Sequence, residues 1–276
     1  MNNTIIYPTD FSKSSNNALL YAVNMAKAIK SKLIIIHSIE LNEAIVSTGN
    51  QEIINKKLEH LEKQSKKQFL AMWNFACKRG VLVETYLVKG DIQKLLPKFI
   101  LDRDPMLVVM GTTGASTLEN KLMGSVTAKV LRNTSSPMLV VPEKEPWRGL
   151  KKITFAFNYE ESDIANLNLL MKIADYYNGQ INITHVLSKG KIDDSNELNR
   201  FLKFKSKVTK AATYSKLNFD LRYSDNVMEG INSALLESES DLLAIVTRKR
   251  NIIERLLEKG VAQEVLYHSQ TPIIIF

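Results

Sequence analysis

The sequence has little of the chemistry that marks a secreted or membrane-embedded protein. Its single cysteine, Cys77, excludes an intrachain disulfide and fits a reducing cytoplasm. The apolar runs, such as residues 33–36, are far shorter than the roughly 20 residues that a bilayer-spanning helix needs. The first residues, MNNTIIYPTDF, lack the basic and then apolar region of a secretory signal. We therefore expect a cytoplasmic protein without membrane association.

Residues for metal binding or nucleophilic catalysis are also scarce. The four histidines and Cys77 show no metal-ligand spacing. We find no convincing Ser/His/Asp order, no paired carboxylates near the glycine loop described below, and no GxxxxGK[ST] phosphate loop. His37 is interpreted as a buried or edge histidine, and Trp73 as a core residue. The sequence therefore predicts no metal site and no catalytic residues.

The net charge of +8 raises the question of nucleic-acid binding. Most lysines lie on the polar faces of predicted helices, and the densest patch is KFKSKVTK at residues 203–210. Zinc-finger spacing, an aromatic RNA-binding signature and a basic zipper are all absent from the sequence. We expect no specific nucleic-acid partner, and only weak attraction to anions.

Short apolar segments alternate with helical patterns along the chain. In the first half the apolar segments are residues 4–8, 33–36, 81–88, 106–110 and 138–141. Several lack the apolar–polar alternation of a half-exposed strand, which indicates burial on both faces, as in a parallel sheet. Alternating strands and helices predict right-handed crossovers and an α/β fold. Ser14 and Ser15 are the expected N-caps of the first helix, and residues 41–50 are expected to form a loop.

The pattern restarts close to Leu150, which indicates an internal duplication. His185 follows His37 at an offset of 148 residues, and VLYHSQTPIIIF at residues 265–276 repeats VLRNTSSPMLVV at residues 130–141. This period is far longer than that of solenoid repeats. We predict two tandem five-stranded domains, residues 1–146 and 147–276, with residues 143–148 as the linker.

The most informative stretch is MLVVMGTTGASTLENKLMGS at residues 106–125. An apolar run ends at Gly111, Gly114 follows, and nine residues later come Gly124, Ser125 and a helical pattern. A strand, a glycine loop and a helix start in this order form a phosphate cradle of backbone N–H groups. Glycine lets the backbone approach the ligand. Ser125 is the expected N-cap of the helix.

The Gly-x-x-Gly, nine-residue, Gly-Ser pattern resembles the nucleotide-binding signature of the universal stress protein family. Asp10 after the first strand, the pair His37–Ser38 after the second, and the strands led by Pro137 and Pro272 also resemble that family. The resemblance covers the whole chain as a tandem pair. It implies a Rossmann-like fold of the adenine nucleotide alpha hydrolase type, with strand order 3-2-1-4-5. Ligands of such sheets bind beyond the carboxyl ends of the strands, at the switch point between strands 1 and 4.

The resemblance implies ATP as the ligand, either alone or with Mg²⁺. Backbone N–H groups of the glycine loop would hold the phosphates, Ser125 would add a hydroxyl, and Asp10 would accept from ribose or adenine. Ser38 would contact adenine through its backbone. The expected nucleotide-binding residues are Pro8, Thr9, Asp10, Ser38, Met110, Gly111, Thr112, Gly114, Gly124, Ser125 and Val126. As an alternative, Asp10 only caps the first helix.

The second copy departs from the pattern. Residues 247–250 read TRKR, so neither loop glycine survives. Lys259 replaces Gly124, Gly260 falls on the position of Ser125, and Asn158 replaces Asp10. We hypothesise that the second half binds no ATP in the manner of the family.

The sequence thus favours an ATP-binding regulator of a stress response, with an unidentified protein partner. Two alternatives stay open: a stress protein that works by protein contacts alone, and a weak ATPase. The segment TDFSKSSN after the first strand has no glycine, which disfavours AMP-forming chemistry. The apolar strands at residues 138–141 and 273–276 are expected to pair antiparallel within the chain as a pseudo-dimer, because unpaired apolar edges promote aggregation. A homodimer is a further possibility.

Overall fold

The computed structural model describes residues 2–41, 43–112, 124–188, 194–246 and 271–276. The chain divides into two compact units, Met1–Lys144 (unit 1) and Glu145–Phe276 (unit 2). Each unit alternates strands and helices, as the sequence pattern predicts.

Unit 1 is a parallel five-stranded sheet with the order β3-β2-β1-β4-β5. The predicted 3-2-1-4-5 order is therefore confirmed. Strand β1 lies between β2 and β4, and its residues Ile5, Ile6 and Tyr7 are fully buried. Its elements are β1 (Asn2–Pro8), α1 (Lys13–Ala28), β2 (Lys32–Ile39), α2 (Glu43–Val46), α3 (Gln51–Cys77), β3 (Val83–Lys89), α4 (Ile92–Arg103), β4 (Pro105–Gly111), α5 (Ser125–Asn133) and β5 (Met138–Val141).

Unit 2 repeats this order as β8-β7-β6-β9-β10, again with parallel neighbours. The registers match: Ile5 pairs with Leu33 in unit 1, and Ile153 pairs with Ile181 in unit 2, each 148 residues later. The duplication read from the sequence is thus present in the fold. The elements are β6 (Lys152–Ala156), α6 (Glu161–Tyr177), β7 (Gln180–Ser188), α7 (Asp194–Ala211), β8 (Leu217–Ser224), α8 (Val227–Ser238), β9 (Leu242–Ile245) and β10 (Ile273–Ile275).

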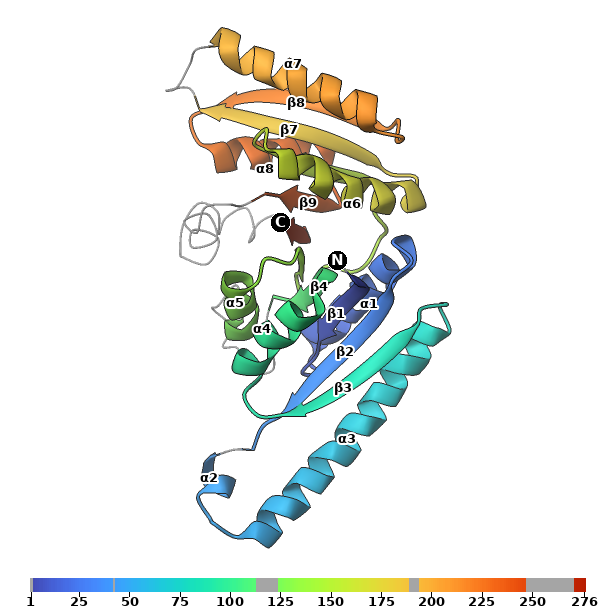
Figure 1. The fold of residues 1–276 in the computed structure, drawn as a ribbon, viewed down its shortest axis with the longest axis vertical. Helices are drawn as coiled ribbons and strands as arrows, with labels where there is room; N and C mark the ends of the chain where they lie inside the picture. Colours follow the sequence, from blue (N-terminus) through green and yellow to red (C-terminus); the bar gives the residue numbers. More distant parts are fainter. Residues whose placement is uncertain (1, 42, 113–123, 189–193, 247–270) are drawn as a thin grey trace. The chain divides into compact units, whose positions relative to one another are not determined.

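The helices of unit 1 cover both faces of its sheet. Helix α1 packs on β1, β4 and β5, and α3 packs on β2 and β3, whereas α4 packs on α5 and β1. Figure 1 shows α4 and α5 on one side of these strands and the long α3 on the other. This division follows from right-handed crossovers that run in opposite directions from β1.

Three local expectations differ from the structure. Residues 43–46 form the short helix α2 within the predicted loop. The N-cap of α1 is Ser12, whose Oγ accepts from the Ser15 backbone N–H, and Ser14 and Ser15 are buried helical residues. Trp73 is 43% exposed and is therefore no core residue. Sequence periodicity predicts a helix well but fixes its first residue poorly.

Candidate functional site

The loop after β1 is held by hydrogen bonds from every side. The Thr9 N–H donates to the Ile36 carbonyl at 2.9 Å, and the Thr9 carbonyl accepts from His37 Nδ1–H at 2.7 Å. Thr9 Oγ1 accepts from the Phe11 N–H at 3.0 Å and from the Ser15 hydroxyl at 2.8 Å. Thr9, a predicted site residue, therefore fixes the path of the chain directly after Pro8.

Tyr7 supports this loop from the core. Its hydroxyl donates to the Ser15 carbonyl at 2.6 Å and lies 2.8 Å from Ser15 Oγ. Burial raises the pKa of Tyr7 to about 12, so the phenol is neutral at physiological pH. The start of α1 is thereby tied to β1.

Asp10 is exposed at the tip of this loop. Its Oδ1 accepts from the Ser12 N–H at 3.0 Å, which closes a turn before the helix. Ser12, and not Asp10, is the N-cap of α1. The alternative that Asp10 caps the helix is therefore wrong. The Asp10 carboxylate instead stabilises the turn that leads into the helix.

The end of β4 lies beside β5 and the start of α5. Met110 is buried, and Gly111 is the last residue of β4. The Thr112 N–H donates to the Val141 carbonyl at 3.0 Å, and the Gly124 N–H donates to the Thr112 carbonyl. Both ends of the glycine loop are thus fixed next to each other. Gly114 itself lies outside the described residues.

Gly111 also approaches the first turn of α1. A Cβ atom built on Gly111 would lie 2.6 Å from Ser14 Oγ and 3.1 Å from the Ser14 carbonyl oxygen. A side chain at this position would have to displace the Ser14 hydroxyl and would also press on the Ser14 backbone. The contact places the end of β4 against the helix that follows Asp10, so two segments about 100 residues apart in sequence meet at this edge, in agreement with the switch-point rule.

Helix α5 begins without a side-chain cap. Its N-cap is Gly124, and no side-chain hydrogen bond caps this end. Ser125 is the first helical residue, so the prediction that it is the N-cap is wrong. Its exposed Oγ accepts from Gln93 Nε2–H at 3.1 Å. Such an end presents N–H groups and the positive end of the helix dipole to an anion.

Two partners of the site were not predicted from the sequence. Gln93, in the first turn of α4, holds Ser125, and Thr127 donates from its Oγ1 to the Gly111 carbonyl at 3.0 Å. The approach of α4 to α5 depends on tertiary packing, which local sequence patterns do not reveal. Among the predicted residues, Val126 lies half-buried in the same helical turn.

Ser38 lies at the end of β2, one strand away. Its hydroxyl donates to the Gly90 carbonyl, which ties β2 to the turn before α4. The Ser38 hydroxyl hydrogen is therefore engaged within the protein.

An aromatic cluster lies behind Asp10. Phe11 has a left-handed backbone, with φ of 61°, and its ring centroid lies 4.3 Å from that of His37. Phe69 packs edge-on against Phe11 at 5.8 Å. Burial lowers the pKa of His37 below its ordinary value, so the imidazole is neutral at pH 7. His37 is thus a structural histidine, as interpreted from the sequence.

Unit 2 keeps this cluster at the corresponding positions. Tyr159 has φ of 62°, and its ring lies 4.1 Å from that of His185. His185 Nδ1–H donates to the Phe157 carbonyl at 2.9 Å, and burial lowers the pKa of His185. The offset of 148 residues therefore preserves a backbone conformation, a histidine and an aromatic side chain.

Unit 2 lacks both the exposed carboxylate of Asp10 and a glycine at the position of Gly111. Asn158 stands in place of Asp10, and the nearby carboxylate of Asp163 is fully buried, where its Oδ2 accepts from the N–H groups of Asn158 and Glu160. The register of β9 puts Val246 where unit 1 has Gly111. The residues 247–250, Lys259 and Gly260 lie outside the described residues.

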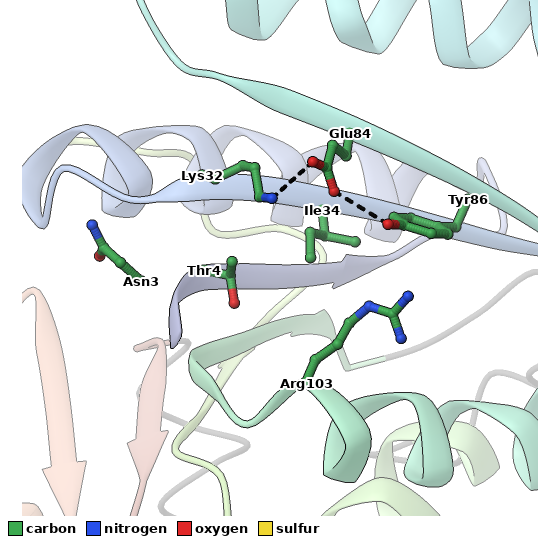
Figure 2. Close-up of a pocket in the computed structure, with 7 residues that line it drawn as sticks. All are labelled: Asn3, Thr4, Lys32, Ile34, Glu84, Tyr86 and Arg103. Carbon is green, nitrogen blue, oxygen red and sulfur yellow. Dashed lines mark hydrogen bonds and ion pairs between the residues drawn. The ribbon is translucent and has the colours of Figure 1, made fainter. Parts of the chain in front are cut away.

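A second hollow in unit 1, of about 360 Å³, lies at the amino ends of its strands, away from Asp10 and Gly111. Figure 2 shows Lys32 paired with Glu84, which also accepts from the Tyr86 hydroxyl. The Arg103 guanidinium lies 4.8 Å from the centroid of the Tyr86 ring. No sequence pattern predicts this hollow.

The described residues offer neither a metal-binding cluster nor a membrane-spanning helix. Within them, no cluster of three or more His, Cys, Asp or Glu side chains is arranged to hold a metal ion. In the same part of the chain, no helix is both long enough and apolar enough to cross a membrane.

Comparison with known sequences gives consistent matches. The profile of the Universal stress protein family matches residues 1–142. Universal stress protein MJ0531 of Methanocaldococcus jannaschii is 32% identical over 145 residues, which are 51% of this chain and 84% of the relative. Universal stress protein YxiE of Bacillus subtilis is 28% identical over 149 residues, which are 51% of this chain and 99% of the relative.

Solved structures match over the full length. A universal stress protein from Archaeoglobus fulgidus DSM 4304 has a TM-score of 0.77 at 16% identity, covering 100% of this chain and 98% of its own. A putative universal stress protein from Pseudomonas aeruginosa UCBPP-PA14 has a TM-score of 0.60 at 13% identity, covering 100% and 93%. These two likenesses concern the fold. A universal stress protein solved in complex with cAMP is 27% identical, covers 50% of this chain and 95% of its own, and has a TM-score of 0.36.

Proposed function

The chain belongs to the universal stress protein family, and from that premise we propose that unit 1 binds an adenine nucleotide, ATP with or without Mg²⁺. The bound nucleotide would act as a regulatory signal in a stress response. The observation that carries the proposal is the contact between Gly111 and Ser14, which brings the Asp10 loop against the start of the glycine loop.

The phosphates are assigned to the N-terminal end of α5. Its first turn has no side-chain cap, so its N–H groups can donate to phosphate oxygens in the favourable field of the helix dipole. The bond from Gln93 leaves the Ser125 hydroxyl hydrogen directed elsewhere, so it can be donated to the same anion. Backbone groups of Gly111, Thr112, Gly124 and Val126, together with Gly114 outside the described residues, complete the proposed cradle.

The nucleoside is assigned to the ends of β1 and β2. Asp10 would accept from ribose or adenine, next to Pro8 and Thr9, whose positions the hydrogen bonds of Thr9 fix. The backbone of Ser38 would contact the adenine ring, and Met110 would support it from the end of β4. A pre-fixed loop lowers the ordering cost of binding.

We propose binding as a signal, and not catalysis, as the main role. Hydrolysis of ATP needs an oriented water and stabilisation of developing charge, whereas the roles above assign Asp10 to the nucleoside. A protein partner that reads nucleotide occupancy would follow from this role, and a cytoplasmic location would supply the ATP.

Unit 2 is proposed as a partner domain without nucleotide. It lacks the exposed carboxylate of Asp10, and the Cβ of Val246 occupies the place where unit 1 requires glycine. It keeps the sheet, the His185 bond and the Tyr159 conformation, which serve the fold.

Thermal unfolding with added ATP and Mg²⁺ tests the proposal. At about a hundred times Kd, one bound nucleotide should stabilise the chain by about 2.7 kcal/mol. Asp10→Asn copies the residue of unit 2 and should reduce this stabilisation at a fixed ATP concentration, whereas the matched control Asn158→Ala should keep it. An equal shift in both variants would place the nucleotide elsewhere. No shift in the natural chain would favour a role through protein contacts.

A further inference from the structure

Unit 2 contains a polar hollow that is separate from the proposed nucleotide site. It has a volume of about 380 Å³ and lies over β6, β7 and β8 beside the C-terminal turn of α8. Three residues of β7 line it, Gln180, Asn182 and Thr184. On β8 the hollow is bordered by Asn218, Asp220 and Arg222.

Two of the three polar residues that β7 contributes to the hollow are buried, whereas Gln180 is exposed. Asn182 is 9% exposed and Thr184 is 1% exposed. Buried polar groups are costly unless they form hydrogen bonds. The fold does not demand them, because the same register positions of β2 in unit 1 hold Ile34 and Ile36. A function specific to unit 2 would explain why it carries an amide and a hydroxyl there.

The amides of this hollow satisfy one another only in part. Asn182 Oδ1 accepts from Gln180 Nε2–H at 2.9 Å and from Asn218 Nδ2–H at 3.4 Å. Gln180 and Asn218 are exposed residues, so the rest of their amide groups is open to a ligand. Among the described residues, Thr184 Oγ1 is buried without a hydrogen-bond partner. The hollow therefore offers both donors and acceptors.

The charges at the border are already paired. Arg222 donates from Nη1 and Nη2 to the two carboxylate oxygens of Glu237, at 2.9 and 2.7 Å, and also to Asp220. Lys152 pairs with Glu239 at 2.7 Å. The Glu237 carboxylate further raises the pKa of Arg222, so this charge is permanent. The two cations that line the hollow are balanced by the two lining carboxylates and by Glu239, so there is no surplus positive charge for a phosphate.

We infer that this hollow binds a neutral polyhydroxylated molecule, a sugar or a polyol. Each hydroxyl group both donates and accepts, which complements a row of amides with free donors and acceptors. An anion would need donors alone, and a cation acceptors alone. The volume falls in the range of small-molecule sites.

Unit 1 provides an internal comparison. At the equivalent register Ile34 replaces Asn182, and Glu84 replaces Asn218. Figure 2 shows that Glu84 there pairs with Lys32 and Tyr86. The hollow of unit 1 thus lacks the partly satisfied amides, and we expect the sugar site in unit 2 alone.

The test is saturation-transfer NMR on the full chain, with glucose, trehalose, myo-inositol and glycerol as separate probes. We expect transfer from at least one of them. The variant Asn182→Ile installs the residue that unit 1 holds at this place, and it should weaken binding roughly tenfold, because buried hydrogen-bonding groups lose their partner. Asn199→Ile, on the exposed face of α7, is the matched control and should bind normally.

A second variant protects the test against loss of folding. Asn218→Glu installs the other residue of unit 1 and should also weaken binding, and far-UV circular dichroism establishes which variants fold. Three results would overturn the inference: no transfer from any probe, equal transfer in the natural chain and the folded pocket variants, or binding of glucose 6-phosphate or inorganic phosphate without binding of the neutral probes.

Discussion

Gly111 carries the most demanding steric requirement of the proposed site. The residue joins β4 to the glycine loop, and its Cα faces the backbone of Ser14. In unit 2 the equivalent position holds Val246, so the two units cannot make the same contact.

Replacing Gly111 with valine copies unit 2 at this position and should destabilise the chain by about 1–3 kcal/mol, because the added atoms meet Ser14 backbone that cannot move freely. Urea unfolding measures this change. Thr112→Val, at the next residue, serves as the control and should have a smaller effect. An unchanged unfolding midpoint in Gly111→Val would show that the contact with Ser14 imposes no constraint.

The two helix starts of the site have different jobs. Helix α1 is capped by Ser12, whereas α5 begins at Gly124 with no side-chain cap. A side-chain cap stabilises the helix, whereas the free N–H groups of an uncapped N-terminus can bind an anion. Ser12→Ala should therefore cost about 1 kcal/mol of unfolding free energy. Ser125→Ala should cost less than about 0.5 kcal/mol, as for an exposed surface residue, yet should lower ATP affinity. Chemical unfolding and calorimetric titration separate these effects, and the reverse pattern would contradict the assignment.

Two histidines, His37 in β2 and His185 in β7, predict that the stability of the chain depends on pH. Burial lowers the pKa values of His37 and His185 below those of the unfolded chain. The unfolded chain therefore takes up protons first as the pH falls below about 6.5. The free energy of unfolding should decrease between pH 7 and pH 5, and this loss should be shallower in the double variant His37→Gln/His185→Gln. Denaturant unfolding at several pH values checks the slope, and equal slopes would refute this origin.

At the same scale, the sequence predicts elements better than their ends. Strand order, duplication and the burial of β1 follow from long apolar patterns and from the family resemblance. Asp10, Ser14 and Ser15 lie near Ser12 and could also cap the helix, so composition alone cannot select Ser12. The exposure of Trp73 and the bond from Gln93 to Ser125 depend on which helix faces meet, which is set by tertiary packing.

For the whole molecule, duplication has preserved structure and allowed chemistry to diverge. Both units hold the histidine, the left-handed aromatic residue and the strand order. Unit 1 holds the glycine pattern and the exposed Asp10, whereas unit 2 holds the amide-lined hollow around Asn182. A tandem chain of this kind can assign different ligands to its two halves.

A chain ending after Lys144 tests the predicted role of the last strand of unit 1. Met138–Val141 is wholly apolar, and an exposed strand edge of this type promotes association. We expect the shortened chain to dimerise or precipitate, whereas the full chain should not do so through this edge. Analytical ultracentrifugation distinguishes the outcomes. A monomeric, well-behaved fragment would argue against the pairing of edge strands that the sequence predicts.

The number of nucleotides bound by each chain tests the central claim most directly. The full chain is purified, denatured, and any released nucleotide is identified and counted by chromatography; if none is retained, the count is repeated after incubation with ATP and Mg²⁺. We expect one adenine nucleotide per chain, and less than one in Asp10→Asn under the same conditions. Two nucleotides per chain would show that unit 2 binds as well. None under both conditions would contradict a nucleotide site in unit 1.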